Sequence, residues 1–209
     1  MTGNREDYLK AIYELGGEKN RIGTKNIASA LKISAPSVSE MIKNLVEEGY
    51  IEYQLYKGVK LTKKGLDEAL HIKKRHLLWE VFLVEKLGYE WEDVHEEAEL
   101  LEHITSSELE ARLDKYLEYP KVCPHGTPLE DKSYLFDAIT MDSIGRGEKT
   151  FIKRFKDEKE VLRFSKDRGL NIGDMIKIVE NELDAPIKIE KNGQYIEIDR
   201  QLAKKIYVK

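Results

Sequence analysis

Apolar residues recur at intervals of three and four along the first 49 residues, with polar residues between them. This spacing predicts three amphipathic helices: one over 4–15, one over 24–31, and a third that Ser34 caps and Gly49 ends. Pro36 fits the first turn of the third helix, where a missing N–H costs nothing. We expect the buried stripe of this helix to contain Val38, Met41, Ile42, Leu45 and Val46.

An alternating pattern follows the third helix. Residues 50–56 and 59–61 flank Lys57-Gly58 and predict a β-hairpin. Helical spacing then returns over 62–88, 91–104 and 106–117. We therefore expect a helical region after the hairpin.

The last third of the chain predicts a small β-barrel. A strand is expected at 149–155 and a helix at 157–168. Three more strands are expected at 175–180, 186–191 and 194–198, the last two joined by the hairpin turn Asn192-Gly193. The fold class is thus mainly α, with a C-terminal β-barrel.

Two short helices with a tight turn, followed by a hairpin, are the plan of a winged helix-turn-helix. In that plan the start of the second helix of the motif meets the base edges of DNA. Small residues there allow a close approach, and serine hydroxyls can bond phosphates or bases. The candidate DNA-contacting residues are Ser34, Ala35, Pro36, Ser37, Ser39, Glu40 and Lys43. The alternative is a winged helix used only for protein contacts.

Composition narrows the class of protein. Of the 209 residues, 41% are hydrophobic, which is enough for packed cores. No apolar run approaches the ~18 residues of a membrane span. The first ten residues are polar, unlike a secretory signal, and the single Cys123 excludes an internal disulfide. We expect a soluble cytoplasmic protein.

The net charge of −4 is unevenly distributed and suggests three domains. Residues 1–70 carry a net +1, residues 71–138 a net −8, and residues 139–209 a net +3. We take these ranges as the winged helix, a helical domain and the barrel. A charge of +1 is weak for DNA binding, so a dimer or a charge-neutralising ligand would help.

The acidic middle carries a pattern typical of metal ligands. His76 and Glu80 are four residues apart and so share one helix face. Four more candidates share one face of the next predicted helix: His95, Glu99, Glu102 and His103. Imidazole and carboxylate groups together suit Mn, Fe(II), Co, Ni and Zn, and the lack of thiolate among them argues against a closed structural zinc site. Solvated acidic helices with surface histidines are the simpler alternative, which the shared faces disfavour.

Motifs of catalysis are missing. The zinc-peptidase signature HExxH does not occur, and a ferritin-like di-iron site would need a second copy of Glu92-x-x-His95. There is no phosphate-binding loop and no serine-nucleophile elbow. We expect no enzyme, and two alternatives stay open: a metal-storage protein or metal-dependent enzyme with an accessory winged helix, and a winged-helix regulator that does not respond to metal.

A winged helix followed by this helix pair resembles the diphtheria toxin repressor family of metal-activated transcriptional repressors. The stretches that carry the resemblance are DYLKAIYEL at 7–15, APSVS at 35–39, HLLWE at 76–80 and HEEAELLEH at 95–103. The resemblance extends over essentially the whole chain. It implies a homodimer that binds operator DNA and controls metal homeostasis, with an SH3-like (FeoA-like) domain at the C-terminus.

The resemblance also implies two metal sites. One would use Asp7, Glu99, Glu102 and His103; the other would use His76, Glu80 and His95. The iron-regulated branch usually has Met and Cys at the positions of Asp7 and Glu99, so the oxygen ligands here favour Mn(II) over Fe(II). The manganese branch often has a further Glu where this chain has Lys10. Since a cation cannot ligate, Lys10 argues against a closely spaced pair of ions.

Two further stretches bear on metal binding. Cys123 and His125 are two residues apart and could bind a metal, but the resemblance places them in a loop with a structural role, which we favour. In the iron-regulated branch the SH3-like domain supplies two polar groups to a metal site. The matching positions here are Lys153 and Lys156, which cannot ligate, so nearby Asp157 or Glu158 would have to substitute.

Overall fold

The computed structural model describes residues 5–130 and 139–209. Asn4, where the first predicted helix would begin, and the end of the predicted middle domain at 138 lie outside the described residues. The chain divides into two compact units, each considered by itself below. The N-terminal unit extends to His76 and includes Glu102–Thr105; the second unit contains Leu77–Leu101 and Ser106–Lys209.

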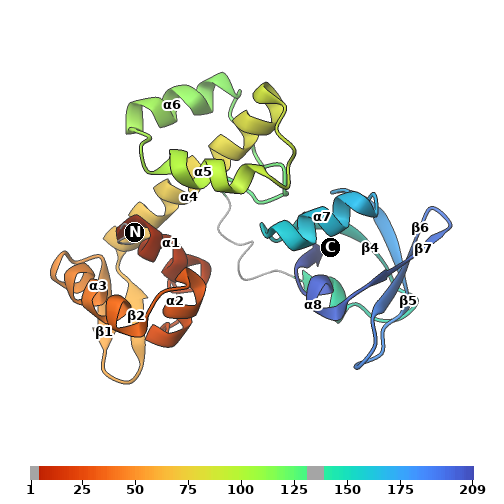
Figure 1. Ribbon diagram of the computed structural model, residues 1–209, viewed down its shortest axis with the longest axis horizontal. Helices are drawn as coiled ribbons and strands as arrows, with labels where there is room; N and C mark the ends of the chain where they lie inside the picture. The colour runs from red at the N-terminus through yellow and green to blue at the C-terminus, as the bar shows by residue number, and fades with distance from the viewer. Residues whose placement is uncertain (1–4, 131–138) are drawn as a thin grey trace. The chain divides into compact units, whose positions relative to one another are not determined.

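The N-terminal unit begins with the three predicted helices: α1 (Arg5–Glu14), α2 (Thr24–Leu31) and α3 (Ala35–Glu47). The predicted cap of α3 is confirmed, because the Ser34 side chain accepts the backbone N–H of Ser37 at 3.3 Å. Pro36 lies in the first turn of α3. Lys32, in the left-handed conformation (φ 54°), makes the tight turn between α2 and α3. Figure 1 shows α1, α2 and α3 grouped with the hairpin that follows them.

The hairpin is a short antiparallel pair, β1 (Ile51–Gln54) and β2 (Gly58–Leu61). A bridge between Ile22 and Val59 adds the segment before α2 to its edge. Gly58 (φ +99°) is required here, because a Cβ would lie 2.2 Å from the carbonyl oxygen of Ile22. The wing is therefore anchored to the helices at its base.

The buried face of α3 is narrower than expected. Val38, Ile42 and Leu45 are buried, but Val46 is 40% exposed. At about 100° per residue, Val46 is displaced by about 80° from Val38 around the helix axis, at the edge of the stripe. Val46 therefore was wrongly assigned to the core.

The second unit opens with helices. α4 (Lys63–Leu87) is one continuous helix whose residues fall in both units, and it is followed by α5 (Val94–Glu102) and α6 (Ser107–Tyr116). Ser106 caps α6 by accepting the N–H of Leu109 at 3.2 Å. Leu77, Leu78 and Val81 of α4 pack with Leu113 and Leu117 in one apolar cluster. None of the helices in the described part of the chain has the length and hydropathy needed to cross a bilayer.

The C-terminal part is a six-stranded antiparallel sheet with the strand order β3-β8-β4-β5-β6-β7. The strands are β3 (Ile139–Thr140), β4 (Lys149–Phe155), β5 (Met175–Glu180), β6 (Ile187–Lys191), β7 (Gln194–Ile198) and β8 (Ile206–Val208). Among the described residues β3 and β7 are edges that do not pair with each other, so the sheet is open rather than the closed barrel that we expected.

Short helices complete this sheet domain. The 3-10 turn η2 (Met141–Ser143), α7 (Lys159–Asp167) and α8 (Arg200–Ala203) connect its strands. Val161 and Leu162 of α7 are buried in one core with Ile152 and Phe155 of β4, which places α7 on a face of the sheet (Figure 1). Trp91, from the segment before α5, packs against the same core. The helical part of the second unit is thereby joined to the sheet domain.

Candidate metal centres and DNA interface

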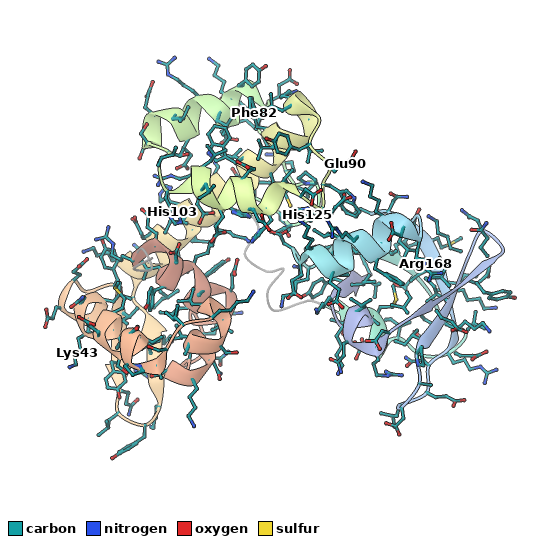
Figure 2. All side chains as sticks on the ribbon, in the orientation of Figure 1. Lys43, Phe82, Glu90, His103, His125 and Arg168 are labelled. Carbon is teal, nitrogen blue, oxygen red and sulfur yellow. The ribbon has the colours of Figure 1, made fainter. Side chains whose placement is uncertain are left out.

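The first cluster of candidate ligands lies in the N-terminal unit and centres on His103, which Figure 2 labels. Its Nε2 lies 2.8 Å from Oδ1 of Asp7, and its Nδ1 lies 2.6 Å from Oε2 of Glu6. Both carboxylates belong to the first turn of α1. Glu102 is also close, with Oε1 at 3.6 Å from His103 Nε2. The structure thus brings together Asp7, Glu102 and His103, and adds Glu6, which sequence reasoning missed.

Glu102 is buried between two nitrogen groups of the N-terminal unit. Its Oε1 accepts from Nζ of Lys10 at 2.6 Å, and its Oε2 lies 2.6 Å from Nδ1 of His76. Burial of this carboxyl opposes its charge, but His76 and Lys10 outweigh burial and lower its pKa. Lys10 therefore sits beside an expected metal ligand as a fixed positive charge.

Glu99 is assigned to the second unit, although it lies on the same helix as Glu102, one turn earlier. Its Oε2 is 3.8 Å from Nε2 of His95, one further turn back on α5. The shared helix face predicted from the spacing is therefore present along α5.

A second cluster lies wholly within the second unit, around the buried imidazole of His125 (Figure 2). Nδ1 of His125 lies 3.4 Å from Oε2 of Glu80 and 3.6 Å from Oδ1 of Asp157. Cys123 adds a buried thiol, and the ligand atoms of Glu80, Cys123 and His125 all lie within 4.8 Å of one another. On the opposite side of the ring, Nε2 donates to the backbone carbonyl of Trp91 at 2.6 Å.

The charges of this cluster are strongly coupled. Burial opposes a charge on His125, but the carboxylate of Glu80, hydrogen bonds with Cys123 and Glu80, and the carboxylate of Asp157 raise the pKa of the imidazole to about 12. Burial and the charge of Glu80 raise the pKa of the Cys123 thiol. At neutral pH the imidazole is therefore protonated and the sulfur carries its hydrogen.

Asp157 links the sheet domain to both histidines of the second unit. Its Oδ2 lies 2.6 Å from Nδ1 of His95. Asp157 lies two residues after the end of β4, so its position depends on the folded sheet. Glu158 instead pairs with Lys156 and Lys205, at 2.6 Å each. Of the two acidic substitutes expected from the sequence, Asp157 is the one that faces candidate ligands.

The chemistry of both donor sets fits a divalent transition metal. Ligand atoms that share one ion at about 2.0–2.3 Å lie about 3–4.5 Å apart. The ligand atoms of Glu80, Cys123 and His125, all within 4.8 Å of one another, are close to this spacing. The first set offers carboxylates and one imidazole, which suit Mn(II) and Fe(II), whereas Cys123 gives the second set a softer donor. The signal for this set was the pair Cys123 and His125, to which sequence reasoning gave a structural role.

The candidate DNA-contacting residues lie together on the surface at the start of α3. All seven of them are exposed: Ser34, Ala35, Pro36, Ser37, Ser39, Glu40 and Lys43. Lys43 is labelled on this surface in Figure 2. The wing adds exposed aromatic rings that sequence reasoning did not select, with Tyr56 96% exposed and Tyr53 48% exposed.

Three family models together match nearly the whole chain. Residues 1–59 match the iron dependent repressor N-terminal DNA binding domain, residues 62–130 match its metal binding and dimerisation domain, and residues 139–209 match the FeoA domain. A helix-turn-helix transcriptional regulator of Methanocaldococcus jannaschii is 41% identical, over 56% of this chain and 95% of that protein. The diphtheria toxin repressor of Corynebacterium diphtheriae is 27% identical, over 100% of this chain and 97% of that protein. The chain belongs to the diphtheria toxin repressor family.

Solved structures of diphtheria toxin repressor relatives agree over the whole length. The manganese regulator SloR is 38% identical, with a TM-score of 0.83 over 100% of this chain and 99% of that chain. A manganese-dependent transcriptional repressor in complex with manganese is 30% identical, with a TM-score of 0.88 over 98% of this chain and 99% of that chain. By sequence, over a shorter stretch, the iron-dependent repressor IdeR of Mycobacterium leprae is 36% identical, over 62% of this chain and 56% of that protein.

As a member of the diphtheria toxin repressor family, this chain is a metal-dependent transcriptional repressor. It binds operator DNA, forms dimers and takes a divalent metal, as its matched domains indicate. Its family places it among regulators rather than enzymes.

Proposed function

We propose that Mn(II) or Fe(II) activates this repressor through two sites with different donor sets. The first would use Asp7, Glu99, Glu102 and His103. The second would use Glu80, Cys123, His125 and Asp157, four groups that the second unit holds close together. This convergence of buried donors is the observation that carries the proposal.

The second site extends the set expected from the sequence, which was His76, Glu80 and His95. His76 lies one turn before Glu80 on α4, and its Nδ1 is hydrogen-bonded to Oε2 of Glu102. His95 is bonded to Asp157. Each of these bonds uses Nδ1, so Nε2 of His95 stays a candidate ligand atom, and the ligand atoms of Glu80, His95 and Asp157 also lie within 4.8 Å of one another. We add His125 and Cys123 as candidate ligands beside Glu80.

The choice of metal follows from the donors. Three carboxylates and an imidazole in the first site favour Mn(II) or Fe(II), the ions that hard oxygen donors bind well. Nζ of Lys10 lies 2.6 Å from Oε1 of Glu102 and supplies the positive charge that a second nearby ion would otherwise supply. We therefore propose that the first site takes one ion.

The link between metal and DNA runs through Asp7. This residue belongs to α1 of the DNA-binding domain, whereas Glu99 and Glu102 belong to α5 of the dimerisation domain. An ion bound by all three would fix the winged helix relative to the dimer and cancel carboxylate charge that repels phosphate. Two recognition helices could then meet DNA about 34 Å apart, one helical turn. Coupling of this kind is typically worth about 1–3 kcal/mol.

The test is DNA retention on a pool of genomic fragments at fixed salt and fixed protein concentration. The arms are Mn(II), anaerobic Fe(II), Zn(II) and chelator. We expect retention only with metal, and the ranking of metals identifies the activating ion. Equal retention with chelator would show that DNA binding does not depend on these donors.

The variant Asp7→Ala sharpens the test, since it leaves all donors of the second site in place. We expect it to bind metal but to lose metal-dependent DNA retention. Arg21→Met, which alters an ion pair with Glu52 at the base of the wing, is the control for general damage to the same unit. Normal metal-dependent retention by Asp7→Ala would refute the proposed coupling.

A further inference from the structure

Trp91 lies outside the proposed donor sets and contacts the candidate ligand His125 in two ways. Its backbone carbonyl accepts the Nε2–H of His125 at 2.6 Å. Its indole ring lies against the same imidazole, with ring centroids 5.9 Å apart and planes tilted by 31°. The hydrogen bond fixes Nε2 as the nitrogen that faces away from Glu80 and Asp157. The ring contact fixes the plane of the imidazole.

The indole itself is anchored in the sheet domain. It packs edge-on against Phe155 of β4, with centroids 5.4 Å apart and planes at 76°, and it joins the apolar core of that domain. The backbone of His125 is tied to the same residue, because its carbonyl accepts the N–H of Phe155 at 3.0 Å. Trp91, His125 and Phe155 thus form a closed triangle of contacts.

Ion pairs hold the segment that carries Trp91 against α7. Nζ of Lys166 lies 2.7 Å from Glu90 and 2.6 Å from Glu92, and Nζ of Lys159 lies 2.9 Å from Asp93. The neighbours of Trp91 on both sides are therefore attached to the sheet domain. Its carbonyl has a defined position only when that domain is folded.

An imidazole has two nitrogens. A carbonyl that accepts the N–H of one nitrogen leaves the other nitrogen to bind a metal. An accepting carbonyl behind a histidine fixes its tautomer and orientation and is worth about 10- to 100-fold in metal affinity. Here Nε2 is committed to Trp91, so Nδ1, which faces Glu80 and Asp157, is the nitrogen available to an ion.

We propose that Trp91 is a positioning residue that orients His125 for metal binding and makes the second site depend on the folded sheet domain. This inference rests on the proposed metal site of Glu80, Cys123, His125 and Asp157. Trp91 does not touch the ion; it acts through the ring of His125.

Co(II) is a suitable probe, because a thiolate bound to Co(II) gives a charge-transfer absorption band and Cys123 is the only cysteine of the chain. The band therefore reports the second site alone. The test variant is Trp91→Leu, which keeps an apolar side chain but loses the stacked ring. The control is Ile189→Val, which trims the same core on β6 away from the site.

Trp91→Leu keeps the backbone carbonyl but loses the indole that anchors it. We therefore expect the variant to bind Co(II) at the thiolate band more weakly than the parent, by up to the ~10- to 100-fold that loss of such a partner costs. Ile189→Val should retain the parental affinity, and Trp91→Phe should recover part of it. Unchanged affinity in Trp91→Leu, or an equal loss in Ile189→Val, would overturn the positioning role. If the parent protein lacks the band, the proposed site itself is overturned. The same holds if the band persists in Cys123→Ser.

A second measurement needs no variant. In the full-length protein loaded with Zn(II), long-range ¹H–¹⁵N spectra should show His125 protonated at Nε2 and bound to the metal through Nδ1. Metal bound through Nε2 in the parent would refute the inference while leaving the site itself intact.

Discussion

Lys10→Met tests how the buried carboxylate of Glu102 is held. The side chain of Glu102 is fully buried, and Lys10 is only 9% exposed at its side chain. Removing one partner of a buried pair costs about 3–5 kcal/mol, because the other charge is left uncompensated. His76 keeps its bond of 2.6 Å to the second oxygen of Glu102, so we expect a loss near the lower end, about 3 kcal/mol. Methionine keeps most of the apolar contact of the lysine stem.

The assay is urea unfolding in chelator, followed by far-UV circular dichroism at one protein concentration. Arg21→Met, which removes a partly exposed pair with Glu52, is the matched control in the same unit and should cost about 0.2–1 kcal/mol. A loss for Lys10→Met no larger than that of the control would refute the reasoning.

The pH dependence of this difference has a definite sign. The pKa of Glu102 is lowered in the folded protein, so its charge contributes stability above the unfolded pKa, and this contribution is lost as pH falls through the folded pKa. Lys10→Met raises the folded pKa of Glu102. The gap between parent and variant should therefore narrow as the solution is acidified below the ordinary glutamate pKa. A gap that widens with acid would contradict the assignment.

Three other changes have defined outcomes. Metal binding at the second site should release two protons per ion near neutral pH: one from His125, whose pKa is raised to about 12, and one from Cys123, whose pKa is also raised. Metal affinity should therefore rise by up to ~100-fold per pH unit. Calorimetry in two buffers counts the released protons. Gly58→Ala should destabilise the wing and weaken DNA retention, because its Cβ would meet the carbonyl of Ile22 at 2.2 Å; unchanged thermal unfolding would contradict this. Ser34→Ala should cost about 1 kcal/mol by removing the cap of α3, measured by thermal unfolding of the metal-free protein.

Periodicity predicted most elements of the fold because their apolar stripes are long. The three helices of the N-terminal unit, the wing, and strands β4, β5 and β7 lie where the sequence placed them. β3 and β8 were missed, since they contain two and three residues and are defined by pairing with distant strands. The open edge between β3 and β7 likewise depends on tertiary pairing that a local pattern does not contain.

The site was predictable only where its residues share a helix. Glu99, Glu102 and His103 follow from spacing along α5, and their resemblance to a known family added Asp7. The cluster around His125 joins residues 80, 125 and 157, which lie 45 and 32 positions apart in the chain. They belong to α4, a loop and the second position after β4. A short motif does not report such a meeting, so the sequence favours a structural role for Cys123 and His125, and their ligand role is a proposal from the geometry.

The placement of Asp157 after β4 has a consequence for the order of biosynthesis. Domains of a chain generally fold as units, with the N-terminal one first, while translation continues. Glu80, Cys123 and His125 leave the ribosome before Asp157 and before the sheet that positions it. While its last domain is still being made, a nascent chain therefore carries all donors of the first site but only three of the four donors of the second site. On the proposed assignment, the second site is therefore complete only in polypeptides whose last domain has been made.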